Sequence, residues 1–303
     1  MIDYHVTIKH FDYAVLLKQH LSLIFFGALA FCPILFYYLK DQFARTGIFV
    51  MIIGFGVFIK RIDWIGLPYI LVLAALIYYA LNANNRILRG WCFLFALGLS
   101  VYSMLYPMPG IVNWPIVRDF TFSYQAVPYS MTLGLEKFLI GFFFLWFSSA
   151  SLVNEGSWNK VIKAFWLPAL LCIAALMPVA FYFHYVQLDF KPTNFYFLWA
   201  IHNLFFVCVA EEAVFRGMIQ NFLTLRFQRI GGGKWLALVI ASALFGLIHF
   251  RGGWIYMVMA GVAGLFYGYA FMRARKIEAS ILTHFCLNSA HFLFFTYPAL
   301  KAI

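Results

Sequence analysis

The segment 210–217, AEEAVFRG, places two adjacent glutamates and an arginine within a strongly apolar stretch of the chain. Glu212 and Arg216 are four residues apart, so on a helix they share one face and can form an ion pair. Glu211 is rotated from its neighbour by about 100° and has no cation near it in sequence. We therefore expect Glu212 and Arg216 to reduce each other's cost of burial, which leaves Glu211 as the candidate for chemistry.

Two further segments carry polar side chains in apolar surroundings. His249 lies in the sequence FGLIHF, four residues after Phe245. His284 is followed four residues later by Asn288 in the sequence THFCLNSAH. Each of these pairs shares one face of a helix. Ionisable side chains inside apolar spans are costly and by default indicate a functional site.

The composition of the chain is that of a membrane protein. Of its 303 residues, 64% are hydrophobic and only 11% are charged, whereas soluble domains carry about 25% charged residues. Apolar runs of about 20 residues are long enough to cross a bilayer as helices. We predict an all-α, multi-pass transmembrane bundle of eight to ten helices, with spans near 21–39, 47–59, 64–81, 90–107, 138–153, 162–186, 193–226, 235–250, 253–272 and 278–297.

The polar side chains are predicted to lie at overlapping depths. The basic clusters 226–234 and 273–276 each join two spans, so both should lie on one side of the membrane, the cytoplasmic side under the positive-inside bias. Glu211 and His249 are each 15 residues from the first cluster, or roughly 22 Å along a helix. By the same measure His284 and Asn288 lie about 12 and 18 Å from the second cluster. This agreement predicts a single site.

Other features exclude other classes of protein. The net charge of +11 comes from basic residues scattered between apolar segments, which is typical of cytoplasmic loops and argues against nucleic acid as a partner. The five cysteines lie in apolar runs without paired spacing, so we expect no disulfide framework and no thiolate metal site.

The three pairs together, Glu211-Glu212-x-x-x-Arg216, Phe245-x-x-x-His249 and His284-x-x-x-Asn288, resemble in this order the motifs of the CPBP family. This family comprises the CAAX-protease and bacteriocin-processing membrane proteins, including the type II CAAX prenyl endopeptidases. The resemblance divides the chain into an N-terminal transmembrane helical block, 1–160, of unassigned role, and a CPBP-like intramembrane protease core, 161–303, with its motifs within 190–297.

The resemblance implies a glutamate-dependent intramembrane endopeptidase. Glu211 would be the general base and His249 would help to hold the attacking water, while His284 and Asn288 would stabilise the oxyanion. Glu212, Arg216 and Phe245 would support the site or bind substrate. The chemistry agrees, because burial makes a carboxylate more basic and His and Asn can supply preorganised donors in a water-poor site.

A metal-dependent mechanism remains open at this stage. One glutamate and two histidines form a zinc ligand set, which here would be Glu211, His249 and His284. The sequence has no HExxH motif, however, and these ligands would come from three separate spans. We expect no cofactor, with a divalent metal such as zinc as the weaker alternative.

Two non-proteolytic functions are the alternatives to an enzyme. A proton-coupled transporter would also bury Glu, His and Arg, and a non-catalytic scaffold or immunity-type protein could keep the motifs for packing. The expected partners are the lipid bilayer and a membrane-embedded or lipidated protein or peptide substrate. The expected location is the inner membrane of a bacterial cell or the endoplasmic reticulum membrane of a eukaryotic one. The polar segment 109–137 is predicted to form an ordered loop or an interfacial segment.

Overall fold

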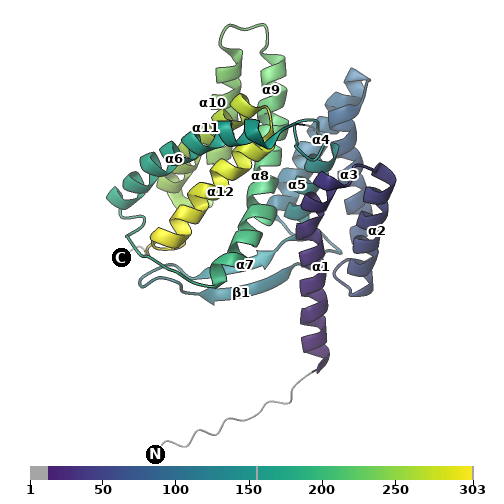
Figure 1. Ribbon diagram of the computed structural model, residues 1–303, viewed down its shortest axis with the longest axis horizontal. Helices are drawn as coiled ribbons and strands as arrows, with labels where there is room; N and C mark the ends of the chain where they lie inside the picture. Colours follow the sequence, from purple (N-terminus) through teal and green to yellow (C-terminus); the bar gives the residue numbers. More distant parts are fainter. Residues whose placement is uncertain (1–12, 155, 302–303) are drawn as a thin grey trace, which may run out of the picture.

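The computed structural model describes residues 13–154 and 156–301, and in this part of the chain it is a helical bundle (Figure 1). Five of its helices are long and apolar enough to cross a membrane, and three shorter ones are also apolar. The predicted all-α transmembrane bundle is therefore confirmed, and the protein is an integral membrane protein. The helices are α1 (Tyr13–Tyr38), α2 (Gln42–Phe58), α3 (Gly66–Asn82), α4 (Arg86–Leu105), α5 (Leu135–Phe147), α6 (Trp158–Tyr182), the continuous helix Phe195–Arg226, α10 (Gly233–Leu247), α11 (Gly253–Ala274) and α12 (Ile277–Phe294).

The polar segment after α4 contains two strands, which the prediction of an ordered loop or an interfacial segment did not include. It forms a two-stranded antiparallel sheet of β1 (Trp114–Phe120) and β2 (Tyr129–Leu133). Register shifts interrupt the pairing twice, and Asp119 has a positive φ of 50°. These irregularities break the alternation of side chains that would reveal a strand in the sequence.

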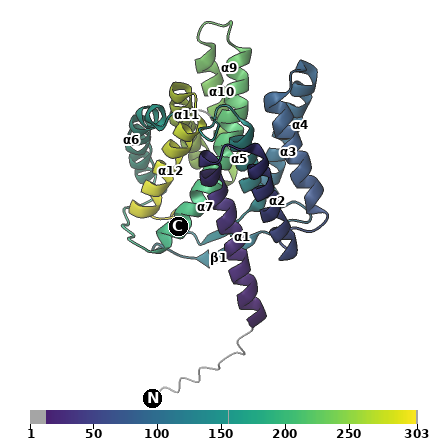
Figure 2. The same ribbon diagram turned by 45° about the vertical axis from the view of Figure 1, so that its right-hand side comes forward.

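The connections between helices lie on two opposite faces of the bundle (Figures 1 and 2). On what we call the hairpin face, the connections bond to one another through the isolated bridges Ile62–Ile111 and Leu188–Phe295. On what we call the basic face, Lys276 Nζ donates to the Ser149 carbonyl. The hairpin face comprises 59–65, 106–134, 183–194, 248–252 and 295–301, and the basic face comprises 39–41, 83–85, 148–157, 227–232 and 275–276.

The helix Phe195–Arg226 is wound unevenly around its two glutamates. The turn Val209–Glu212 (α8) is α-helical, but it is flanked by π-helical segments at Asn203–Cys208 (η1) and Ala213–Gln220 (η2), and Asn221–Arg226 (α9) completes the helix. π-Helical turns within α-helices are rare and frequently mark functional sites. The wider turns change which side chains share a face, so the direction of each glutamate cannot be derived from ideal helical spacing.

Close packing fixes this helix against α5. A Cβ added at Gly217 would lie 2.2 Å from the Phe144 ring, and one added at Gly141 would lie 2.6 Å from a Val209 methyl carbon. Such distances are far inside van der Waals contact, so both glycines allow the backbones to approach. Residues 135–147 thus support the segment that carries Glu211.

We predict that Gly217→Ala destabilises the folded protein by about 1–3 kcal/mol, because overpacking forces Phe144 to move. Gly54→Ala on α2 is the matched control, since a Cβ there meets nothing within 4 Å. Thermal unfolding of both variants in detergent checks this prediction. Equal unfolding temperatures for the two variants would contradict the packing described here.

Candidate active site

The two adjacent glutamates have different surroundings. Glu212 is fully buried, with Oε2 3.1 Å from Arg216 Nε and Oε1 3.0 Å from His284 Nδ1. An ionised carboxylate only accepts hydrogen bonds, so His284 must donate from Nδ1. Oε1 of Glu212 is therefore hydrogen-bonded, whereas Oε2 is paired with the Arg216 cation without an aligned hydrogen bond. Arg216 and His284 together hold this side chain in place.

Arg216 is also fully buried, and its Nε and Nη1 have no hydrogen-bond partner among the described residues. Its Nη2 donates to the Gly264 carbonyl on α11 at 3.0 Å. The guanidinium lies 4.6 Å from the Phe245 ring centroid and 5.5 Å from that of Tyr267. A buried cation is costly unless it is paired and hydrogen-bonded, and aromatic faces add further stabilisation.

Glu211 faces a different histidine. Its Oε2 lies 4.0 Å from His249 Nε2, and the two side chains keep 10% and 18% of their surface exposed. This distance is too long for a direct hydrogen bond. His249 Nδ1 is 2.7 Å from the Phe245 carbonyl, which can only accept, so Nδ1 carries a proton. In the neutral ring, Nε2 is then an acceptor directed at a carboxylate, which is also an acceptor.

Asn288 belongs to a second polar group beside the histidines. Its Nδ2 donates to Asn203 Oδ1 at 3.2 Å, and the Cys208 thiol donates to the same oxygen at 3.2 Å. The same nitrogen also donates a longer hydrogen bond, of 3.8 Å, to the Cys208 sulfur, which is a weak acceptor. Asn203 and Cys208 therefore position Asn288, and a stronger acceptor can replace the sulfur as the partner of its second hydrogen.

A small cavity of about 70 Å³ lies beside the two histidines and Asn288, and neither glutamate is among the residues that line it. His249, His284 and Asn288 line it, together with aromatic side chains that include Phe245 and Tyr267. A buried water needs about 10–15 Å³ of such space and two to four polar partners. The cavity is thus able to hold water next to His249.

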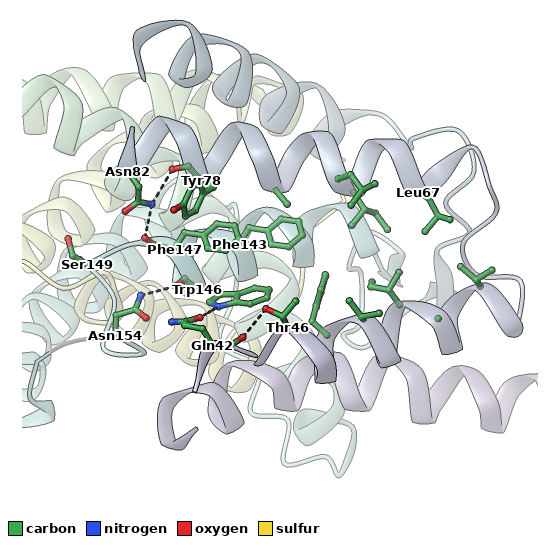
Figure 3. A pocket seen from close by; sticks show the side chains of 18 residues that line it. Gln42, Thr46, Leu67, Tyr78, Asn82, Phe143, Trp146, Phe147, Ser149 and Asn154 are labelled. Carbon is green, nitrogen blue, oxygen red and sulfur yellow. Dashed lines mark hydrogen bonds between the residues drawn. The ribbon is translucent and has the colours of Figure 1, made fainter. Parts of the chain in front are cut away.

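A much larger cavity, of about 1080 Å³, lies elsewhere, between α2, α3 and α5 (Figure 3). Its polar side chains, among them Gln42, Asn82 and Asn154, gather at one end, and the other end near Leu67 is apolar (Figure 3). No acidic or basic side chain lines it. This cavity is large, but it lacks the acidic and basic side chains that peptide hydrolysis requires.

The structure brings the sequence-predicted residues together in two sets. Glu211 lies against His249, whereas Glu212 lies against Arg216 and His284. Phe245 connects the sets, because its ring is 4.7 Å from the His249 ring and 5.8 Å from the His284 ring. The alternative zinc ligands Glu211, His249 and His284 do not converge, and within the described residues no group of three or more His, Cys, Asp or Glu side chains has metal-binding geometry.

Sequence reasoning missed several residues that shape the site. Tyr267 stacks on His284 with ring centroids 4.5 Å apart, and Tyr256 lies edge-on to His249 at 5.5 Å. Aromatic residues are so frequent in this chain that neither gave a signal. Asn203 did give a signal in the sequence, because it is a polar residue in an apolar run, eight positions before Glu211.

Comparison with known proteins gives one match. Residues 192–290 match the family model described as type II CAAX prenyl endopeptidase Rce1-like. The matched range contains all seven motif residues and covers about a third of the chain. No curated protein and no solved structure matches the chain. The match supports a CAAX-type intramembrane endopeptidase at the level of the family.

We predict that Arg216→Met destabilises the protein by about 3–5 kcal/mol, because it leaves the Glu212 carboxylate buried without its cation. The double variant Glu212→Gln/Arg216→Met should recover most of the loss, since neither charge remains. Arg273→Met, at an exposed position of α11, is the control and should change stability by no more than about 0.5 kcal/mol. Unfolding temperatures in detergent measure all three, and a double variant no more stable than Arg216→Met would contradict the pairing.

Proposed function

We propose that the protein hydrolyses a peptide bond within the membrane, with Glu211 as general base. The premise is the match of residues 192–290 to the Rce1-like CAAX endopeptidase family. The observation that carries this proposal is the difference between the two glutamates. Glu212 is paired with Arg216 and hydrogen-bonded to His284 and is fully buried, whereas Glu211 Oε2 faces His249 Nε2 across 4.0 Å and keeps some exposure. Glu211 is therefore the glutamate that we assign to the water molecule.

The attacking water would bridge Glu211 and His249. Two acceptors at this separation can each receive one hydrogen from the same water, which directs the oxygen lone pairs toward a substrate carbonyl. As the water oxygen bonds to the carbonyl carbon, Glu211 takes one proton. When the carbon–nitrogen bond breaks, protonated Glu211 returns that proton to the leaving amine.

The tetrahedral oxyanion would be stabilised by Asn288 and His284. Asn288 Nδ2 donates one hydrogen to Asn203 and the other only to the weakly accepting Cys208 sulfur, at 3.8 Å, so the oxyanion would take the second hydrogen. His284 already donates from Nδ1 to Glu212, so its Nε2 donates only when the ring is an imidazolium. Glu212, itself paired with Arg216, holds the His284 ring by its Nδ1, which gives Glu212 and Arg216 a positioning role in addition to their structural one.

No metal takes part in this proposal, and the substrate is a membrane-associated or lipid-modified protein or peptide. The bilayer surrounds the site, so a substrate anchored in it reaches the site by lateral diffusion. A scaffold or a transporter would use the same buried side chains without cleaving a peptide bond, and the Glu211 variant below distinguishes these cases.

We expect Glu211→Gln to lower the cleavage rate of a membrane-anchored substrate by about 10²–10⁴-fold, the usual contribution of a general base. The amide has the same shape as the carboxylate, so folding should be preserved. Glu278→Gln on α12 is the matched control, because its Oε1 accepts from Ser151 and Leu152 and its amide keeps an acceptor there.

The same assay with a strong chelator tests the metal-free mechanism. Unchanged cleavage is expected, whereas loss of activity restored by zinc would move Glu211, His249 and His284 to the role of ligands. Full activity of Glu211→Gln would remove Glu211 from the mechanism.

We expect Asn288→Ala to lower kcat by about 10²–10³-fold with a smaller effect on KM, because an oxyanion donor acts mainly in the transition state. Cys286→Ala, two residues away on α12 and outside the cavity lining, serves as the control. Steady-state kinetics on the same substrate separates the two constants. A rise in KM at unchanged kcat would instead assign Asn288 to substrate binding.

A further inference from the structure

The large cavity between α2, α3 and α5 has no part in the proposed hydrolysis, and its two ends differ in chemistry (Figure 3). Gln42 begins α2 and Asn82 ends α3, so the polar end lies beside the connections of the basic face. Val57, near the end of α2, and Leu67, near the start of α3, line the apolar end toward the hairpin face. The cavity therefore runs from one face of the bundle into its apolar interior.

The dimensions of this cavity suit the hydrocarbon tails of a lipid. Along α2, 15 residues separate Gln42 from Val57, and along α3, 15 residues separate Leu67 from Asn82. Each separation is about 22 Å along a helix, which exceeds half of a hydrocarbon core about 30 Å thick. The volume of about 1080 Å³ is large for a ligand pocket, since these are usually about 300–1,000 Å³.

Large apolar side chains form the walls between the two ends. Phe143 and Trp146 of α5 lie between α2 and α3 (Figure 3). Val50 and Leu71 line the cavity and yet keep 60% and 69% of their surface exposed, so the cavity is open toward the membrane. Interfaces between membrane helices are enriched in small residues, whereas most of the lining side chains are large. These walls suit flexible hydrocarbon tails better than another helix.

The polar end offers an unpaired donor and an unpaired acceptor. Gln42 Oε1 accepts from Trp146 Nε1 at 3.0 Å, which leaves the amide nitrogen of Gln42 without a partner among the described residues. Asn82 Nδ2 donates to the carbonyls of Tyr78 and Phe147 at 3.1 and 3.2 Å, which leaves Oδ1 without one. An indole N–H only donates and a carbonyl only accepts, so both amide orientations are fixed. A hydroxyl group both donates and accepts, and it matches this pair.

Basic residues close in sequence to the polar end are directed to other partners. Lys40 Nζ donates to the Val153 carbonyl at 2.9 Å, and the buried Arg45 donates from Nε to the Leu39 carbonyl at 2.6 Å. Arg86 lines a separate cavity. None of these cations lines the large cavity, so an ionised head group would lack a counter-charge there. An uncharged head group avoids that cost.

We propose that this cavity binds a neutral lipid, with a hydroxyl head group between Gln42 and Asn82 and hydrocarbon tails along α2 and α3. Acylglycerols are the chemical class that combines such a head group with long tails. The site lies outside the matched residues 192–290. Binding does not require peptide hydrolysis, so this proposal and the proposed function can fail separately.

Competition photolabelling of the purified full chain tests the head-group chemistry. The probe is a diacylglycerol with a diazirine in one tail. The competitors are dioleoylglycerol and dioleoyl phosphatidic acid, which differ only in the phosphate. We expect dioleoylglycerol to compete about tenfold better, because the phosphate finds no counter-charge, and the labelled peptides to come from α2, α3 and α5. Equal competition by the two lipids would indicate annular lipid only and would overturn the proposal.

A filled cavity tests the location of the site. Gly54 lines the cavity and a Cβ added there meets nothing within 4 Å, so Gly54→Leu should fill the space and lower labelling by about tenfold. Gly47→Leu, on the same helix, is the matched control, because a Cβ there also meets open space but Gly47 does not line the cavity. Equal labelling of the two variants would overturn the proposed site.

A cation introduced at the polar end tests the head group from the side of the protein. Asn82→Lys should reverse the preference in favour of dioleoyl phosphatidic acid, because the ammonium supplies the missing counter-charge. Asn84→Lys, outside the cavity lining, should keep the preference for dioleoylglycerol. If Asn82→Lys kept that preference too, the head group would not lie beside Asn82.

A photocrosslinker at Val50 identifies the occupant in the host membrane. p-Benzoylphenylalanine at this exposed lining position should form an adduct with the mass of an acylglycerol. A crosslink to another polypeptide or to a second copy of the chain would overturn the proposal.

Discussion

The buried ion pair between Glu212 and Arg216 is the interaction on which the rest of the site depends. Neither charge can remain alone in a low-dielectric interior. Arg216 therefore takes the Gly264 carbonyl and the Phe245 and Tyr267 rings as further partners, and Glu212 takes His284. These contacts join the helix Phe195–Arg226 to α10, α11 and α12, so satisfying one pair of charges also positions the other polar groups.

The same constraint gives two neighbouring carboxylates different tasks. The glutamate that neutralises Arg216 is fully buried, with one oxygen beside the guanidinium and the other bonded to His284, whereas the one beside it faces a histidine at a distance that admits a water. The flanking π-helical segments, together with the close contact of Gly217 with α5, set the directions of both side chains. In the proposed mechanism, two adjacent residues of a single helical turn thus serve catalysis and stability, Glu211 the first and Glu212 the second.

Much of the fold and of the candidate site could be predicted from the sequence. The rest could not, and the reasons are physical. Long apolar runs fix the spans, and i,i+4 spacing gave the Glu212–Arg216 pair. Equal distances from the basic cluster 226–234 gave the agreement in depth of Glu211 with His249. The choice of partner for His284 could not be derived, because the π-helical turns alter the direction of each glutamate. The strands Trp114–Phe120 and Tyr129–Leu133 were missed because their bulges hide the period of two. Tyr267 was missed because an aromatic residue is unremarkable in this composition.

The central claim is that Glu211 and Glu212 divide catalysis and stability between them. The most direct measurement compares Glu211→Gln with Glu212→Gln, following cleavage of one membrane-anchored substrate and the unfolding temperature of each variant. We expect Glu211→Gln to lose cleavage at an unchanged unfolding temperature, and Glu212→Gln to unfold at a lower temperature because Arg216 loses its counter-ion. If Glu212→Gln abolished cleavage at unchanged stability while Glu211→Gln remained active, the assignment of the two glutamates would be contradicted.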